Sequence, residues 1–279
     1  MMFDEDVYAN AQLYRQDSRG YPSLEAPSAT APLPGTPFYH LQLHTLNTRE
    51  ALDFCRQCFS RDRPATLYFV NAHCFNVSRD DRDYLRALEQ CDLVLNDGLG
   101  IKLASKLINV ELKENMNGTD FIPKLLALAA TEDKRVYLLG AKAGIATEAK
   151  EKLEQRLEGL DICGTCSGYF TAEEEPEIIE RINASRAEIV VVGMGVPLQE
   201  KWIFRNKDKF THAKIIVAGG AIIDFSAGRV KRAPVFIRAI GLEWLFRFAQ
   251  EPRRLFDRYF IGNWKFFQHI LYMRLRFGK

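Results

Sequence analysis

The sequence predicts an α/β fold in which helices flank a mostly parallel β-sheet and a separate helical segment follows at the C-terminus. Two observations indicate the sheet: short apolar runs rich in Val, Ile and Leu recur along the chain, and amphipathic helical stretches separate them. Strands that alternate with helices of this length are joined by crossover connections and therefore lie parallel. A third observation, a C-terminal stretch rich in basic and aromatic residues, indicates the helical appendage.

The N-terminal end is predicted to lie outside the fold. Residues 1–37 contain the Pro-, Ala- and Ser-rich stretch SLEAPSATAPLPGTP, a composition typical of disordered or loosely attached segments. The first residues, MMFDEDVY, are acidic and do not resemble a signal peptide. No apolar run reaches the roughly 18 residues that a membrane-spanning helix needs. We therefore expect a chain that stays in the reducing cytosol.

Five segments are predicted to be strands of the central sheet. Each is an apolar run that ends in, or leads into, a Gly, Asn or Asp residue. The segments are Thr66–Asn71, Leu93–Asp97, Val136–Gly140, Val190–Val192 and Ile215–Gly220. Amphipathic helices are predicted between them at Arg82–Gln90, Phe121–Ala130, Ile145–Leu157 and Pro176–Ala184. This order of elements predicts a Rossmann-like domain over residues 38–227.

The ends of these strands predict where a site lies. In a parallel sheet the carboxyl ends of the strands line one crevice, which is the usual ligand site of such folds. Asn71, Asp97, Gly140 and Gln199 all fall at or just after strand ends. We therefore expect these four residues to share one face of the molecule.

Residues 188–203, EIVVVGMGVPLQEKWI, are the strongest single indication of a ligand at this face. A buried strand leads into a turn with Gly193 and Gly195, and a helix begins after Pro197. The glycines allow a ligand to approach the backbone closely, and the helix N-terminus favours an anion such as a nucleotide diphosphate. A purely structural turn of a doubly wound protein gives the same pattern, so this segment does not decide alone.

The six cysteines include two pairs with C-x-x-C spacing, Cys55 with Cys58 and Cys163 with Cys166. This spacing occurs in zinc sites, but the two pairs are much farther apart than in a small zinc ribbon. The first pair also falls in a helical stretch. We expect buried or reduced thiols, with zinc as the weaker alternative.

The segment Asp81-Arg82-Asp83 matches the DxD motif of metal-dependent glycosyltransferases. It precedes a predicted helix and does not end a strand. Its carboxylates are therefore expected to cap the helix N-terminus, and no metal is expected there.

Residues 228–279 are predicted to form the basic helical appendage. This segment holds twelve Lys and Arg residues, three Asp and Glu residues, and twelve aromatic residues, whereas the whole chain has a formal net charge of only +2. Such a segment suits an anionic membrane surface or a phosphate-rich ligand, and no motif supports a nucleic acid. The alternative is a helical pair with an aromatic core and solvated arginines.

Several motifs together resemble the WecG/TagA/CpsF family of glycosyltransferases of bacterial surface-polysaccharide synthesis. The matching segments extend from about residue 38 to about residue 268, and the last two, GRVKRAP and LEWLFR-x4-EPRR, are long and unusual. The others are the strand before Asn71, LVLNDGLGIKLASKL, NGTDF, YLLGAKAG, CGTCSGYF, VVGMGVPLQEKWI and GGAIIDFSAG.

The resemblance implies an inverting transfer of a hexose-type sugar, such as N-acetylmannosamine, from a UDP-sugar. The acceptor is a sugar linked through diphosphate to a polyprenol lipid. The resemblance also implies a metal-independent enzyme that uses no cofactor besides the donor. We expect a peripheral protein on the cytoplasmic face of the bacterial inner membrane. The sequence leaves the exact donor, the acceptor sugar and the linkage position open. It also leaves the oligomeric state open, and a homo-oligomer is possible.

Such a reaction requires a carboxylate that takes the proton from the acceptor hydroxyl. Asp97 matches the Asp-Gly motif of the family and is the expected catalytic base. Its alternative role is to cap the helix that follows it. The resemblance also implies that Asn71 binds one of the two sugars and that Gln199 contacts the nucleotide or the donor sugar.

The same resemblance implies that two groups of residues bind the UDP part of the donor. Gly140, Gly193 and Gly195 are expected to give room for UDP, and Lys142 to lie near a phosphate. In the appendage, arginines are expected to close over the site and screen the leaving diphosphate. These arginines are Arg247, Arg254 and Arg258.

Two departures from the family pattern affect the choice of donor. Phe69 stands where many members have Thr, and the segment Glu-Asn-Met-Asn-Gly at 114–118 lacks the Arg of the common Glu-Arg-Val-Ala-Gly. A glucosyl or other hexosyl donor therefore remains open.

Two other classes of protein were weighed. A nicotinamide-dependent oxidoreductase is disfavoured because GMGVPL lacks the third Gly of the dinucleotide fingerprint. A non-catalytic sugar-nucleotide binder or membrane-assembly protein on the same fold is the main alternative, and the presence of Asp97 argues against it.

Overall fold

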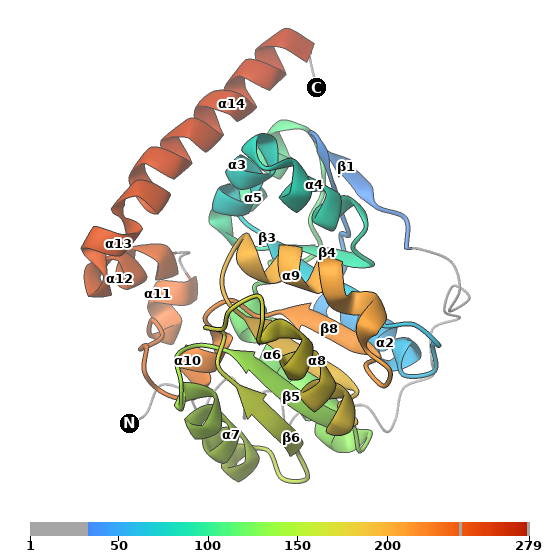
Figure 1. Cartoon of the computed structure of the whole chain (residues 1–279). Coiled ribbons are helices and arrows are strands. Elements are labelled where there is room, and N and C mark those ends of the chain that lie inside the picture. Colours follow the sequence, from blue (N-terminus) through green and yellow to red (C-terminus); the bar gives the residue numbers. More distant parts are fainter. Residues whose placement is uncertain (1–32, 240–241, 278–279) are drawn as a thin grey trace.

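The computed structural model describes residues 33–239 and 242–277. A six-stranded sheet forms the centre of the molecule, with the strand order β4-β3-β8-β7-β5-β6 (Figure 1). All neighbouring strands are parallel, which confirms the predicted fold class. The strands are β3 (Ala65–Val70), β4 (Leu93–Asn96), β5 (Arg135–Gly140), β6 (Asp161–Cys166), β7 (Ile189–Gly193) and β8 (Ile215–Ala218).

Five of these strands were predicted and β6 was not. β6 reads DICGTC and lies at the edge of the sheet, where only Ile162 is fully buried. An edge strand needs less apolar surface than a central one, so its sequence carries a weaker signal. The hairpin of β1 (Thr36–Phe38) and β2 (Leu41–Leu43) was also missed, because strands of three residues are too short to show a period.

Helices cover both faces of the sheet. Alternate strand residues point to opposite faces, so that Leu67 and Phe69 belong to one core and Tyr68 and Val70 to the other. The first core is closed by α2 (Thr48–Cys58), α6 (Gly118–Thr131), α7 (Ile145–Arg156) and α10 (Ile222–Ser226). The second is closed by α3 (Ala72–Asp80), α4 (Arg82–Glu89), α5 (Gly98–Leu107), α8 (Glu175–Ala184) and α9 (Leu198–Asn206), with the short 3-10 helix η1 (Lys207–Lys209) after α9.

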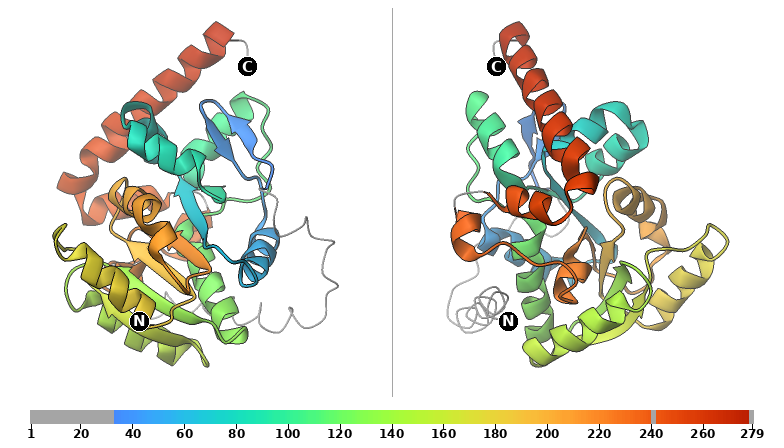
Figure 2. Two further views of the ribbon diagram at one scale, coloured as in Figure 1. Left: turned by 45° about the vertical axis from the view of Figure 1, so that its right-hand side comes forward. Right: turned by 90° about the vertical axis from the view of Figure 1, so that its left-hand side faces the viewer.

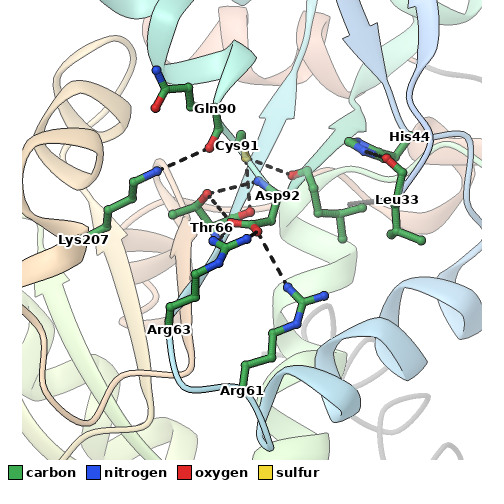
Figure 3. Close-up of polar contacts among 10 residues, drawn as sticks. Leu33, His44, Arg61, Arg63, Thr66, Gln90, Cys91, Asp92 and Lys207 are labelled. Carbon is green, nitrogen blue, oxygen red and sulfur yellow. Dashed lines mark hydrogen bonds and ion pairs between the residues drawn. The ribbon is translucent and has the colours of Figure 1, made fainter. Parts of the chain in front are cut away.

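A polar clamp holds β3 and β4 together at their amino ends (Figure 3). Asp92 accepts hydrogen bonds from the Thr66 N–H at 3.0 Å and the Thr66 hydroxyl at 3.2 Å. The same carboxylate forms ion pairs with Arg63 at 2.9 Å and Arg61 at 3.7 Å. Asp92 is thus engaged in strand pairing at the amino ends of the strands, on the opposite side of the sheet from their carboxyl ends.

The C-terminal segment is helical, as predicted. It consists of α11 (Val235–Ala239), α12 (Glu243–Gln250), α13 (Pro252–Phe256), a π-helical turn η2 (Asp257–Ile261) and α14 (Gly262–Phe277). α14, red in Figure 2, docks on α3 through the fully buried Phe266, whose ring centroid lies 5.1 Å from that of Phe75. None of the helices in the described part of the chain is long and apolar enough to cross a membrane.

Most of the expected N-terminal extension, residues 1–32, lies outside the described residues. Thr36 and Pro37, the last two residues assigned to it, begin β1. All six cysteines are free thiols, and Cys55, Cys58 and Cys74 are buried.

Candidate active site at the carboxyl edge of the sheet

A cavity of about 2240 Å³ lies where the strand ends meet the C-terminal helices. Its volume is more than twice that of a usual small-molecule site, about 1,000 Å³ at most, so it has room for two substrates. Eight of the ten predicted site residues line it: Asn71, Asp97, Lys142, Gly193, Gly195, Gln199, Arg247 and Arg258.

Asp97 follows β4 and stands at the N-cap position of α5. Its N–H donates to the Val70 carbonyl at 2.8 Å, which fixes the backbone at this point. Its carboxylate makes no bond to the start of α5. The capping bond is made by Asn115, whose Oδ1 accepts the Gly98 N–H at 2.8 Å. The alternative role of Asp97 as the helix cap is therefore wrong, and its carboxylate is left to face the cavity.

The surroundings of Asp97 raise its pKa. Burial of the carboxyl is the largest cause, because it disfavours the charged form. The hydrogen bond from Asn71 and the positive charges of Arg258 and Arg247 act in the opposite direction, while Glu243 raises the pKa further. A carboxylate with a raised pKa is a stronger base, which suits proton abstraction from a hydroxyl.

Asn71 uses both ends of its amide. Oδ1 accepts from the His73 N–H at 3.0 Å and the Cys74 N–H at 3.2 Å and thereby caps α3. Nδ2 donates to Asp97 Oδ2 at 3.2 Å. The start of one helix thus orients the carboxylate at the start of another. The observed contacts make Asn71 a positioning group for Asp97; its contact with a sugar stays a prediction.

The three predicted glycines differ in their surroundings. Gly140 has φ 158°, and a Cβ there would lie 2.4 Å from the Gly193 carbonyl oxygen. The two residues pair in the β5–β7 register, so a side chain at Gly140 would obstruct this pairing. A Cβ on Gly193 would instead lie 2.7 Å from the Gly220 carbonyl oxygen, in the loop after β8. Gly140 lies behind the lining of the cavity. Gly195, at φ 82°, has open space next to it on the cavity side.

Gln199 joins two loops at the floor of the cavity. Its Oε1 accepts the N–H groups of Gly195 and Gly220, both at 3.0 Å, and so ties the loop after β7 to the loop after β8. Its Nε2 donates to Glu200 Oε1 at 2.8 Å, which fixes the orientation of the amide. One amide proton remains for a ligand, and the predicted contact with the nucleotide or donor sugar is untested.

Glu200, which lies behind Gln199 and does not line the cavity, is the least expected residue of this region. It is buried, and burial raises the pKa of its carboxyl to about 7. Its second oxygen, Oε2, has no hydrogen-bond partner among the described residues. The sequence places Glu200 next to Gln199, yet nothing in the sequence shows that its side chain points inward.

The appendage brings positive charge to the cavity. Arg258 lines it, and the buried Nε of Arg258 has no hydrogen-bond partner in the described part of the chain. Arg247 also lines it, with its guanidinium 5.1 Å from the centroid of the Phe225 ring. Lys142 is exposed at the rim. Arg254 lies in α13, but its side chain is outside the described structure.

An ion-pair cluster that was not predicted anchors the appendage. The buried Arg232 contacts Asp120 of α6 at 2.6 Å and Glu243 of α12 at 3.3 Å, and Arg238 contacts Asp120 at 3.4 Å. Asn117 also donates to the Asp120 carboxylate, at 2.6 Å. All of these residues except Arg238 belong to the NGTDF, GRVKRAP and LEWLFR motifs, so the motif pattern was the signal that could have identified them.

Asp81 caps α4, as predicted. Its carboxylate accepts the N–H groups of Asp83 and Tyr84, both at 3.0 Å, and pairs with Lys201 at 2.9 Å. Within residues 33–239 and 242–277, no three His, Cys, Asp or Glu side chains come together in a metal-binding arrangement.

Comparisons with known proteins show the family of the chain. The model of the glycosyl transferase WecG/TagA/CpsF family matches residues 36–279. The chain is 34% identical over 171 residues to a protein of Bacillus spizizenii, which covers 61% of this chain and 65% of the relative, just under two thirds. It is 32% identical over 190 residues to a protein of Bacillus subtilis, covering 68% and 73% of the two chains. A Staphylococcus aureus protein is 28% identical over 199 residues, covering 71% and 77%. All three are named N-acetylglucosaminyldiphosphoundecaprenol N-acetyl-beta-D-mannosaminyltransferase.

Proposed function

The chain belongs to the WecG/TagA/CpsF family of glycosyltransferases, and on this premise we propose that it transfers a hexose-type sugar from a UDP-sugar to a polyprenyl-diphosphate-linked sugar. N-acetylmannosamine or a related sugar is the proposed donor group, as in the names of the relatives. The observation that carries the proposal is one cavity in which the carboxylate of Asp97 meets the arginines of the appendage.

In the proposed reaction Asp97 takes the proton from the acceptor hydroxyl. The acceptor oxygen then forms a bond to the anomeric carbon of the donor, on the face opposite to the diphosphate. The bond between that carbon and the UDP oxygen breaks, and UDP leaves with the electron pair. The result is inversion at the anomeric carbon, because attack and departure occur on opposite faces.

Arg258 and Arg247 are the groups proposed to stabilise the leaving diphosphate. The Nε of Arg258 is a donor without an acceptor among the residues that the structure describes, and a phosphate oxygen would satisfy it. Such fixed positive charge stabilises negative charge that develops in the transition state. The proposal needs no cofactor besides the UDP-sugar.

We further propose that the enzyme works at the surface of an anionic membrane, on the cytoplasmic face of the bacterial inner membrane. A lipid-linked acceptor places the reaction there, and the basic, aromatic-rich C-terminal helices support the attachment.

The test is a turnover screen of UDP-sugars with a lipid-diphosphate-linked acceptor, comparing the wild type with Asp97→Ala. UDP release that requires acceptor and falls by about 10² to 10⁴ in the variant is expected for loss of a general base. Asp92→Ala is a poor control because Asp92 holds the sheet, so Asp83→Ala, an exposed carboxylate on α4, serves instead. UDP binding without turnover of any sugar would favour the non-catalytic binder.

A further inference from the structure

One end of the cavity is apolar. Leu99 and Leu103 of α5 and Phe267 of α14 line it there, with 39%, 43% and 37% of their surfaces exposed. Large apolar side chains exposed in a row are uncommon on a soluble surface and mark a place where another apolar group binds. The loops after β5 and β7, where the nucleotide is expected to bind, contribute other residues to the lining.

The apolar end continues outward as a strip along two helices. Leu107 of α5 and Leu271 and Leu275 of α14 extend it, with 36%, 55% and 79% exposure. Leu99, Leu103 and Leu107 follow one another at intervals of four residues, so they form one face of α5. At a rise of about 1.5 Å per residue, this face is about 12 Å long.

The two helices lie side by side and run in the same direction. Near the start of α5, a Cβ on Gly100 would lie 3.7 Å from the ring of Phe266. Near its end, Arg274 donates to the Leu107 carbonyl at 2.8 Å. The stretch from Gly100 to Leu107 therefore runs alongside the stretch from Phe266 to Arg274. The two rows of apolar side chains lie on these neighbouring helices and form one strip that leads from the cavity.

The charged residues of these two helices are all basic. α5 carries Lys102 and Lys106, α14 carries Lys265, Arg274 and Arg276, and neither helix contains an acidic residue. Lys265 and Arg258 also line the cavity. A ligand with a hydrocarbon chain and an anionic group at one end would match both features.

We infer that this strip, Leu99, Leu103 and Leu107 with Phe267, Leu271 and Leu275, binds the first isoprene units of the acceptor lipid. Leu103 lies six residues after Asp97, about 9 Å along the axis of α5. This separation leaves the acceptor sugar and its diphosphate between the base and the beginning of the hydrocarbon chain. The inference rests on the proposed function and names the part of the acceptor that the strip recognises.

The test is a chain-length series in solution, without vesicles or detergent. The acceptors are N-acetylglucosaminyl diphosphates that carry a methyl group or a prenyl chain of one, two or three isoprene units. For the wild type, KM for the acceptor should fall at least tenfold from methyl to three units, because each buried CH₂ group favours binding. The values of kcat should change much less.

A double variant, Leu103→Asn with Phe267→Asn, should lose most of this dependence on chain length and keep its KM for the methyl acceptor and for the donor. Leu103→Met should retain the dependence, because it keeps an apolar side chain of similar volume. Leu245→Asn is the matched control, since Leu245 is 42% exposed and does not line the cavity. Thermal unfolding of each variant confirms that it folds.

Three results would overturn the inference or its premise. Equal chain-length dependence in the wild type and the double variant would show that the chain binds elsewhere. If KM of the wild type does not depend on chain length in solution and the double variant no longer binds vesicles, the strip would contact the bilayer and not the acceptor chain. Failure of the wild type to glycosylate any acceptor of the series, including one with a full-length chain in vesicles, would instead reject the proposed function.

Discussion

At the scale of single residues, the site depends on an asparagine that serves two helices. Asn71 caps α3 with its oxygen and donates to Asp97 with its nitrogen. The two halves of the amide can be separated experimentally, because aspartate also caps helices well but has no donor.

Replacing Asn71 by Asp should therefore move the pH dependence of catalysis while α3 stays capped, and it should cost about 1.4 kcal/mol of stability at neutral pH for each unit by which the pKa of Asp97 rises. A second carboxylate 3.2 Å from Asp97 Oδ2 would raise the pKa of Asp97 further, and the lost hydrogen bond acts in the same direction. Asp97 would then become protonated at a higher pH. The midpoint of the acid limb of kcat/KM should therefore shift to higher pH, by about one unit or more. The pH–rate profile measures this shift. Asn71→Ser, which also caps α3 but adds no charge, should show a smaller shift of the midpoint. If the acid limbs of both variants coincide with that of the wild type, the role given to Asn71 is wrong.

Glu200 makes a different prediction, about stability. Its pKa is raised by burial from 4.5 to about 7, so the folded protein holds a proton between these values that the unfolded chain releases. The contribution of Glu200 to the free energy of unfolding is complete below about pH 4.5 and is lost as the pH rises through about 7. The loss amounts to roughly 3 kcal/mol. Glu200→Gln removes the titration and keeps an oxygen for Gln199. Urea unfolding at pH 5 and pH 8 should show the variant gaining roughly 3 kcal/mol relative to the wild type at the higher pH. A constant difference would mean that Glu200 titrates normally.

Residues at strand ends could be predicted because topology alone places them. Asn71, Asp97 and Gln199 follow strands of one parallel sheet, and such positions meet at one edge whatever the details of packing. Asn115 could not be predicted as the cap of α5, because its bond to Gly98 connects two points of an irregular loop that has no periodic pattern. The buried state of Glu200 also depends on tertiary packing.

At the scale of elements, the start of α5 determines whether Asp97 is available. Asn115 satisfies the first N–H of this helix, while the carboxylate of Asp97 makes none of the bonds to the next N–H groups that an N-cap residue usually makes. The cap and the base are thus two neighbouring groups with separate tasks.

Asn115→Ala should cost about 1 kcal/mol of stability, the usual value of a cap. The loss of transfer activity should be larger, at least about tenfold, because the start of α5 would lose its anchor and Asp97 could turn to the N–H groups of the first turn. Asn47→Ala is the matched control: Asn47 caps α2 by the same kind of bond to the Glu50 N–H and does not line the cavity. Unfolding free energies and initial rates of both variants give the comparison. If the two variants lose activity equally, the effect of Asn115 is one of stability alone.

Elements were predicted where their sequence period was clear. β7 and β8 are apolar along their whole length, since both faces are covered. α3 was missed because AHCFNVSRD has only a weak amphipathic pattern and follows directly on a predicted strand. It forms because Asn71 caps it and because Phe75 packs between β1 and α14. Both contacts are tertiary, so the sequence of α3 does not reveal them.

At the scale of the whole molecule, the sheet domain and the appendage form one site. Arg258, Arg247 and Glu243 of the appendage all act on the pKa of Asp97 in the sheet domain. The composition of residues 228–279 predicted a basic helical appendage, and the resemblance to the family implied that it meets the site. The ion pairs of Arg232 that hold it there were not predicted.

The appendage should also control attachment to membranes. Removal of Arg247–Lys279 should release the protein from anionic vesicles and sharply reduce activity. Since this truncation also uncovers Phe75, a milder variant with Lys265, Arg274 and Arg276 changed to Gln is the better probe. At about 1 kcal/mol for each basic residue, it should bind anionic vesicles roughly a hundredfold more weakly. Co-sedimentation with anionic and neutral vesicles measures this, and unchanged binding by both variants would reject the membrane proposal.

The clamp around Asp92 has a consequence for how this protein can diversify. The bonds that fix the register of β3 and β4 lie at the amino edge of the sheet, whereas the loops that line the cavity leave from the carboxyl edge. Mutations that reshape the loops for another sugar therefore do not touch the contacts that align these two strands. A lineage can change its substrate by altering one rim of the sheet while the opposite rim preserves the architecture.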